Sequence, residues 1–317
     1  MNRSPWGERI TGDSSERKAT YHWLINVREI GLAVSSSSRT VSLRVSSSTL
    51  RGESPLTVGC ELTASGLAPL ASEDTLPGFR ARLEAEMVPP GTEFEVYRRG
   101  AAVGRFVVDG PVEVAPGYCG QTLSFPGYVE LVPSVSGTGR LLGLPVGTLP
   151  SPTRVIPPFE EASRGQRINI LRLYGEQITA NRARWPQDVQ SARRDLQVID
   201  LDRGSTSAMV STFLYRDQLN VSAPGANAYS MFMVAENPTN AYEARYVWYR
   251  PVSTRGKGAP RLLDLLDWDG DGGMEMLLDV NGETQQWFAV VDETSPGQWD
   301  LAYQEECGLP APPAAQP

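Results

Sequence analysis

Histidine, cysteine and long apolar runs are scarce in this chain of 317 residues. The only histidine, His22, lies between Tyr21 and Trp23, which argues against a histidine-based zinc site, catalytic triad or proton shuttle. No run of about 18 apolar residues occurs, so we expect no membrane-spanning helix. The motifs GxSxG, HExxH and GxxxxGKS/T are also missing. These absences indicate a protein that is not an enzyme.

The three cysteines, Cys60, Cys119 and Cys307, allow one disulfide in any of three pairings and leave one thiol. No CxxC occurs, which excludes a zinc ribbon or a thioredoxin-like motif. Cys119 lies in a tight PGYCGQ loop and Cys307 precedes a proline-rich tail, and loop positions are easy to bridge. One disulfide would indicate an oxidising compartment, whereas three reduced thiols are the alternative.

The N-terminus does not read as a signal peptide, because residues 1–20 are polar and the apolar stretch at 21–25 is too short. The other features favour export. We therefore expect an extracytoplasmic location, periplasmic or peripheral to a membrane, with a cytoplasmic location as the alternative.

The net charge of −8 is unevenly distributed. From Pro260 to the end, the chain has twelve acidic residues and one basic residue, Arg261, or −11, and the preceding residues carry +3. An acidic surface repels phosphate, so we expect no nucleic-acid partner. The acidic end suits a cation or a basic protein partner.

Glycine (30) and proline (25) are abundant, and because both break helix interiors the composition predicts a mainly β fold. Apolar and polar residues alternate from Val41 to Val45, and further strand-like segments follow, with turn residues about every 8–12 positions. We therefore predict a β-sandwich or small barrel over residues 36–132.

The rest of the chain divides by composition. We expect residues 1–35 to be an extended N-terminal segment, 133–159 to be a linker rich in proline and glycine, and 308–317 to be a disordered tail. Residues 160–307 are predicted to form a second β-rich domain.

One amphipathic helix is predicted at about 160–183 in this second domain, because Ile170 or Leu171, Tyr174 and Ile178 fall at helical spacing. Four arginines occupy its other face: Arg164, Arg167, Arg172 and Arg182. They form either a solvated face or a contact for the acidic C-terminal region or for a partner.

One segment carries a chemical motif: residues 267–275 read Asp-Trp-Asp-Gly-Asp-Gly-Gly-Met-Glu. Oxygen ligands at alternate positions of a glycine-rich turn suit a hard cation, and such close carboxylates repel one another without one. An EF-hand would need Glu at its twelfth position, where Leu278 stands. The flanking segments 262–266 and 274–280 are strand-like.

This strand–loop–strand arrangement resembles the calcium loop of FG-GAP/VCBS-type repeats. The resemblance implies a Ca²⁺ site made by Asp267, Asp269, Asp271, Glu275 and the Gly273 carbonyl.

Residues 195–214 align with 262–281 as a degenerate second copy, which indicates an internal duplication. Gly204 and Ala208 replace two of its four side-chain ligands, so we expect this copy to be structural and free of ions.

We expect a non-catalytic structural or interaction protein that docks on a larger assembly, such as an extrinsic subunit of a respiratory or photosynthetic membrane complex. Trp248, Tyr249 and Trp287 are the candidate partner-binding residues, because large aromatic side chains dominate interface energies. The alternative is a carbohydrate- or cell-surface-binding module that has a structural Ca²⁺ site and uses exposed aromatic residues.

Overall fold

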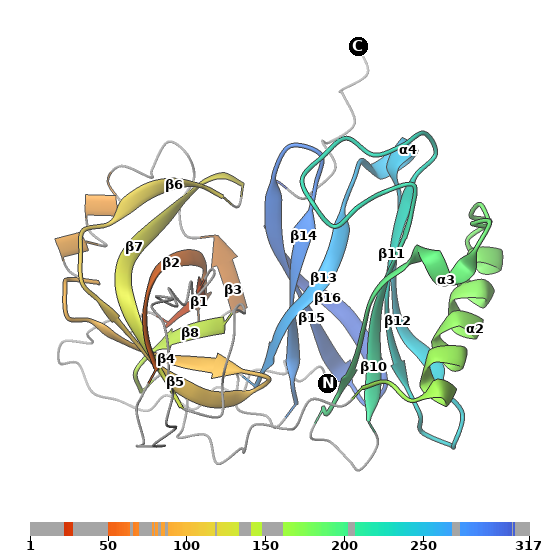
Figure 1. Ribbon diagram of the computed structural model, residues 1–317, viewed down its shortest axis with the longest axis horizontal. Helices are drawn as coiled ribbons and strands as arrows, with labels where there is room; N and C mark the ends of the chain where they lie inside the picture. The colour runs from red at the N-terminus through yellow and green to blue at the C-terminus, as the bar shows by residue number, and fades with distance from the viewer. Residues whose placement is uncertain are drawn as a thin grey trace, which may run out of the picture.

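The protein is described from a computed structural model. The described residues are 22–27, 50–63, 66–69, 78, 80–81, 84–85, 88–117, 119–132, 141–147, 161–201, 207–267, 273–305 and 307. The fold is mainly β, as predicted, and consists of a barrel and a two-sheet sandwich that carries one long helix (Figure 1). The strand predicted at Val41–Val45 and the tail at 308–317 lie outside the described residues.

The N-terminal half is a closed antiparallel barrel. Its strands are β1 (His22–Val27), β2 (Leu50–Thr63), β3 (Gly66–Pro69), β4 (Glu93–Arg98), β5 (Ala101–Val108), β6 (Glu113–Gly117), β7 (Gly120–Leu131) and β8 (Leu141–Pro145). Six of them pair in the ring β2–β1–β8–β4–β5–β7, and β7 pairs back to β2. The other two strands lie outside the ring: β3 pairs with β2, and β6 pairs with β7. Closure removes free sheet edges and selects the barrel over the sandwich for this half.

Two barrel strands lie outside the predicted barrel boundaries. β8 falls within the segment 133–159 that we predicted to be a linker, and β1 falls within the predicted extended segment 1–35. Each pairs with strands far away in sequence: β8 with β1 and β4, and β1 also with β2. A short strand that is defined by such distant pairing has little local pattern, so composition alone assigned it to a loop.

The C-terminal half contains two four-stranded antiparallel meanders. The first sheet is β9 (Arg193–Ile199), β10 (Ala208–Tyr215), β11 (Tyr229–Glu236) and β12 (Glu243–Pro251). The second sheet is β13 (Ala259–Leu266), β14 (Glu275–Asn281), β15 (Gln286–Ser295) and β16 (Gln298–Gln304). The short helix α4 (Val252–Arg255) connects the two sheets. Each sheet has its strands in sequence order, so consecutive strands are hydrogen-bonded neighbours.

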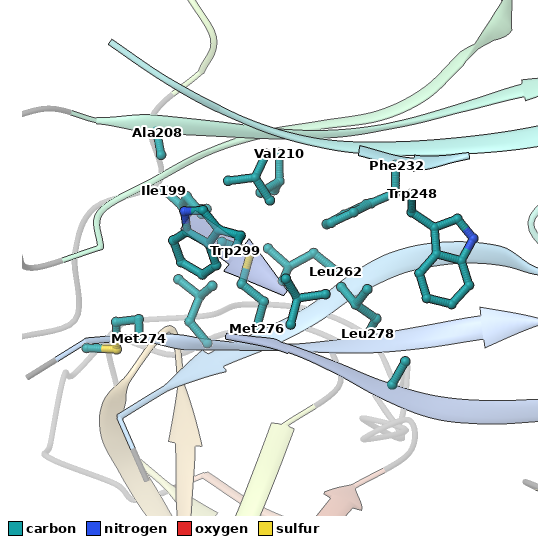
Figure 2. Packing of buried hydrophobic residues seen from close by; sticks show 14 of the residues in the cluster. Ile199, Ala208, Val210, Phe232, Trp248, Leu262, Met274, Met276, Leu278 and Trp299 are labelled. Carbon is teal, nitrogen blue, oxygen red and sulfur yellow. The ribbon is translucent and has the colours of Figure 1, made fainter. Parts of the chain in front are cut away.

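The two sheets pack face to face around an apolar core. Phe232 and Trp248 of the first sheet meet Leu262, Met276 and Leu278 of the second (Figure 2). Alternate residues of the central strands point to opposite faces, and both sets are covered, so β10, β11 and β14 are buried almost throughout.

Helix α2 (Arg164–Ala180) covers the outer face of the first sheet, and α3 (Val189–Ala192) follows it. The predicted helix is confirmed, with Ile170, Tyr174 and Ile178 buried against that sheet. It begins with a capping box in which Ser163 and Gln166 satisfy each other's backbone amides. Among the described residues, no helix is long and apolar enough to cross a membrane.

The barrel covers the remaining face of the second sheet. Leu142 and Leu144 of β8 and Tyr97 of β4 pack against Leu277 and Phe288. The layers therefore run from helix to sheet, sheet and barrel, and the second sheet lies between the sandwich core and the barrel (Figure 1).

Candidate functional site

The predicted calcium loop joins β13 to β14. Leu266 pairs with Glu275 at the base of this loop, which places Asp267 beside the start of β14. Glu275 is only 2% exposed and Gly273 is also buried, so a buried acidic side chain lies at this end of the sheet. Asp269 and Asp271 lie outside the described residues. Of the five predicted ligands, the structure therefore describes Asp267, Gly273 and Glu275.

The loop between β9 and β10 is closed by a strand pair equivalent to the one at the β13–β14 loop. Ile199 pairs with Ala208, and both positions lie 67 residues before the pair Leu266 and Glu275. The residue at the Glu275 position is here the buried Ala208, which offers no side-chain oxygen. Asp202 and Gly204 lie outside the described residues.

The aromatic residues predicted to bind a partner are mostly interior. Trp248 and Trp287 are 8% and 3% exposed because they fill the core between the two sheets. Tyr249 is half-buried and packs against Tyr229 on the helix-covered face. The interpretation of the two tryptophans as free surface anchors is therefore wrong. Their alternating strand positions did not reveal which face would be covered.

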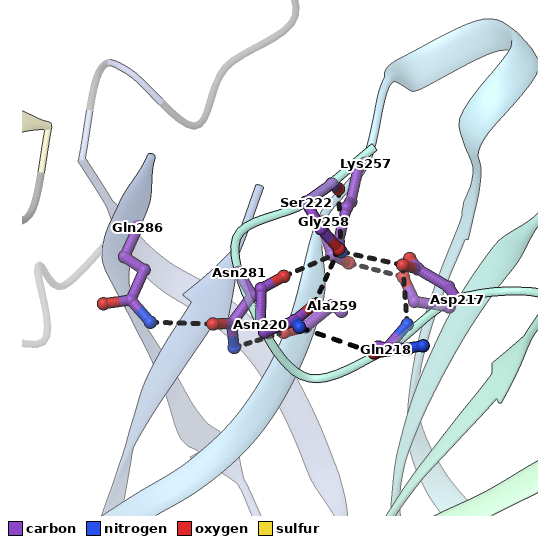
Figure 3. A network of polar contacts seen from close by, with 10 residues as sticks. Asp217, Gln218, Asn220, Ser222, Lys257, Gly258, Ala259, Asn281 and Gln286 are labelled. Carbon is purple, nitrogen blue, oxygen red and sulfur yellow. Dashed lines mark hydrogen bonds and ion pairs between the residues drawn. The ribbon is translucent and has the colours of Figure 1, made fainter. Parts of the chain in front are cut away.

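A buried ion pair connects the two sheets at one end of the sandwich. Lys257, just before β13, is 2.8 Å from the carboxylate of Asp217, and both side chains are at most 1% exposed. The ammonium also donates to the carbonyl oxygens of Asn220 and Ser222, at 2.7 and 3.1 Å (Figure 3). The three N–H donors of the Lys257 ammonium therefore all have partners, and Lys257 holds the β10–β11 loop against the second sheet.

A second buried carboxylate lies where the barrel meets the sandwich. Asp264 accepts hydrogen bonds from the backbone amides of Arg99 at 2.6 Å and Leu265 at 2.8 Å. Arg99 and Gly100 form the β4–β5 turn with φ angles of 53° and 73°, as the two-residue hairpin requires. Burial raises the pKa of Asp264 to about 7, and the two amides oppose that rise.

A disulfide joins the β6–β7 turn of the barrel to the C-terminal end of the sandwich. It links Cys119 and Cys307, which are 188 positions apart in sequence. The same turn donates a backbone hydrogen bond from Cys119 to Gln286 at 2.7 Å. The loop positions of these two cysteines had favoured bridging, but the sequence left all three pairings open.

Glu305 lies beside this disulfide. Its Oε2 is 3.6 Å from the Cys119 sulfur and accepts the Phe288 amide at 2.7 Å. Because burial dominates, the pKa of Glu305 is raised to about 8. Within the described residues, these three side chains form the one cluster with metal-ligand chemistry, but two of its atoms are bonded to each other as a disulfide.

A cavity of about 390 Å³ lies at the same end of the sandwich as Lys257. Its walls come from α4, the β14–β15 turn and Cys307. Arg250 lies over the Trp287 ring at 5.6 Å and donates to the Gly256 carbonyl at 3.0 Å. The cavity is thus polar and cationic, and it is lined by backbone turns as well as by arginines.

When the chain is compared with protein-family models, with curated proteins and with solved structures, nothing matches it.

The buried carboxyl groups predict that stability falls as the pH rises. The folded protein holds protons on Asp264 and Glu305 that the unfolded chain releases near pH 4 to 4.5, so the free energy of unfolding should decrease from about pH 4 to about pH 8. Each group contributes up to about 1.4 kcal/mol per pH unit within its own window. Asp264→Asn should make the free energy of unfolding less dependent on pH up to about pH 7, whereas Asp300→Asn, at an exposed position, should not. Urea unfolding at several pH values measures this, and identical slopes for wild type and Asp264→Asn would contradict it.

The ion pair between Lys257 and Asp217 gives a second prediction. Lys257→Met leaves a buried carboxylate without its partner and should lower the free energy of unfolding by about 3–5 kcal/mol. The double variant Lys257→Met/Asp217→Leu should recover a large part of that loss, because neither charge is then buried. A double variant that is no more stable than the single one in denaturant unfolding would refute this account.

Proposed function

We propose that the protein is a non-catalytic binding protein that acts outside the cytoplasm and docks on an acidic surface of a larger protein assembly, such as a membrane complex to which it is extrinsic. The observation that carries this proposal is the exposure of two large apolar side chains, Ile168 on α2 and Trp185 just after it, in a segment rich in arginine. Ile168 and Trp185 are 58% and 55% exposed there. Trp and Arg are the residues that most often carry binding energy at protein interfaces.

The indole of Trp185 contacts the helix at Gly175. A Cβ built on Gly175 would come within 3.2 Å of its Cη2 atom and 3.7 Å of its Cζ3 atom, so this edge of the ring lies against the glycine while Trp185 remains 55% exposed. A ring held in this way loses little freedom when a partner covers it, which favours binding.

The arginines around this pair are held by local contacts. Arg172 contacts Glu176 at 2.5 Å and donates to the Tyr242 carbonyl at 2.8 Å, and Arg167 donates to the Ala162 carbonyl at 2.8 Å. We call Ile168, Trp185 and the arginines Arg164, Arg167, Arg172, Arg182 and Arg184 the α2 surface. Its excess of positive charge supports an acidic partner and a salt-dependent association.

The disulfide supports a location outside the cytoplasm. Cys119–Cys307 connects segments 188 positions apart, and structural disulfides persist in oxidising compartments. It also supports a binding role, because it adds a covalent tie between the barrel and the sandwich that carries the α2 surface, and a rigid surface loses less entropy on docking.

Ca²⁺ is part of this proposal as a structural ion. Asp267, Asp269, Asp271 and Glu275 would hold it together with the Gly273 carbonyl, and the ion would neutralise carboxylates that otherwise repel one another. The burial of Glu275 next to the loop supports this assignment.

A carbohydrate ligand is the second candidate, and the exposure of Trp185 favours it. Sugar rings stack on exposed aromatic side chains, and Trp185 is the exposed one among the tryptophans whose burial the structure describes. Arginines around the ring then contact hydroxyl groups rather than carboxylates.

The calcium assignment predicts a single tight site in the second loop. Asp269→Ala should abolish the heat of Ca²⁺ binding in calorimetry, whereas Asp202→Ala, at the matching position of the first loop, should leave it unchanged. At a hundredfold excess of Ca²⁺ over Kd, the wild type should gain about 2.7 kcal/mol of stability. Equal heats for wild type and Asp269→Ala would refute the site.

Docking on the α2 surface predicts a defined loss on mutation. The double variant Ile168→Ala/Trp185→Ala should associate at least tenfold more weakly with membranes or solubilised complexes of the native source. Added salt should weaken the association of the wild-type protein. Val146→Ala, at an equally exposed position on the barrel, is the matched control.

The two candidate functions differ in outcome. Binding to the native complexes that depends on both Trp185 and salt supports protein docking. Retention on polysaccharide that needs Trp185 but not low salt supports the carbohydrate reading. Wild-type binding that the double variant retains in full would show that the α2 surface is not the site.

A further inference from the structure

One cysteine of the Cys119–Cys307 disulfide lines a cationic cavity, and the other lies beside a buried carboxyl group. We propose that this disulfide is a thiol-exchange site for a small anionic thiol: the thiol attacks Cys307 from the cavity, Cys119 is the leaving group, and Glu305 gives it a proton. This assignment goes beyond docking, since it concerns another part of the molecule.

Cys119 lies in a turn that is not buried, so attack at Cys307 depends on entry through the cavity. Cys307 is among the residues that line it, whereas Cys119 is not. A thiolate must approach a disulfide sulfur on the side opposite to the sulfur that leaves. Entry through the cavity therefore directs attack to Cys307 and makes Cys119 the leaving group.

The charges around the cavity determine which thiols enter. Arg250, Arg255 and Lys257 line it, with Glu283 as the acidic residue among the lining side chains. Lys257 is paired with Asp217, so the two arginines provide the positive potential. An anionic thiol is concentrated by such a potential, whereas a cationic thiol is repelled.

Glu305 lies on the leaving-group side. Its Oε2 is 3.6 Å from the Cys119 sulfur, and the side chain is held in place by the Phe288 amide. The raised pKa of about 8 keeps Glu305 largely protonated near neutral pH. A proton donor at this position prevents a thiolate from being left beside a buried group, which lowers the barrier for leaving.

The exchange proceeds in two steps. The incoming thiolate forms a bond to the Cys307 sulfur, the S–S electron pair moves to the Cys119 sulfur, and that sulfur takes the proton of Glu305. A second thiolate then attacks the mixed disulfide, which releases the oxidised small disulfide and the Cys307 thiolate. Solvent protonates that thiolate and Glu305. Overall, two small thiols are oxidised to one disulfide while Cys119 and Cys307 become thiols.

The first test compares three probe thiols on the full oxidised chain: glutathione (anionic), 2-mercaptoethanol (neutral) and cysteamine (cationic). Each rate of Cys119–Cys307 reduction is divided by the rate of the same thiolate with a small neutral disulfide. We expect glutathione to be favoured about tenfold over 2-mercaptoethanol at low salt, and cysteamine to be disfavoured. Arg255→Gln should remove most of this preference, whereas Arg105→Gln, on the barrel, should not.

The second test addresses the leaving group. Glu305→Gln can still accept the Phe288 amide but donates no acidic proton, so we expect its exchange to be at least tenfold slower, while Asp264→Asn exchanges like the wild type. Peptide mass spectrometry after acid quenching should find glutathione on Cys307. Glutathione on Cys119, no dependence on thiol charge, or an unchanged rate in Glu305→Gln would each overturn the proposal.

Discussion

In the second sheet, β13, β14 and the first half of β15 are buried on both faces, and the positions of the sandwich and of the barrel follow from that burial. Met276 and Leu278 on one face fill the sandwich core, while Leu277 and Phe288 on the other face meet the barrel. Burial of apolar surface contributes about 25 cal/mol per Å², so exposing either face would be costly. The barrel therefore serves as the cover that this sheet needs, much as α2 covers the first sheet.

Polar groups at the boundaries of these layers specify how the layers fit together. Asp264 fixes the β4–β5 turn of the barrel, and Lys257 fixes the β10–β11 loop. Buried ionisable groups add little net stability but penalise any arrangement in which they lack their partners. Thr212, which donates to the Pro260 carbonyl at 2.7 Å, has a similar effect between the two sheets.

The sequence was sufficient for features with a local signal. The period of α2 and the strands on both sides of the Asp-rich loop could both be predicted, because each depends on neighbours within a few residues. Three other features depend on contacts between distant segments: the pairing of β8, the burial of Trp248 and Trp287, and the choice of Cys119 and Cys307. The buried carboxyl groups were missed for the same reason, since only the packed barrel makes Asp264 an interior residue.

Native-state hydrogen exchange tests most directly whether the barrel and the sandwich are one cooperative body. The two parts share the second sheet, so the slowest amides of β4 and β8 should exchange with the same opening free energy as those of β14 and β15. The opening free energies of these four strands should also fall equally with denaturant concentration. Barrel amides that open at a much lower free energy, while β14 and β15 stay protected, would contradict the account.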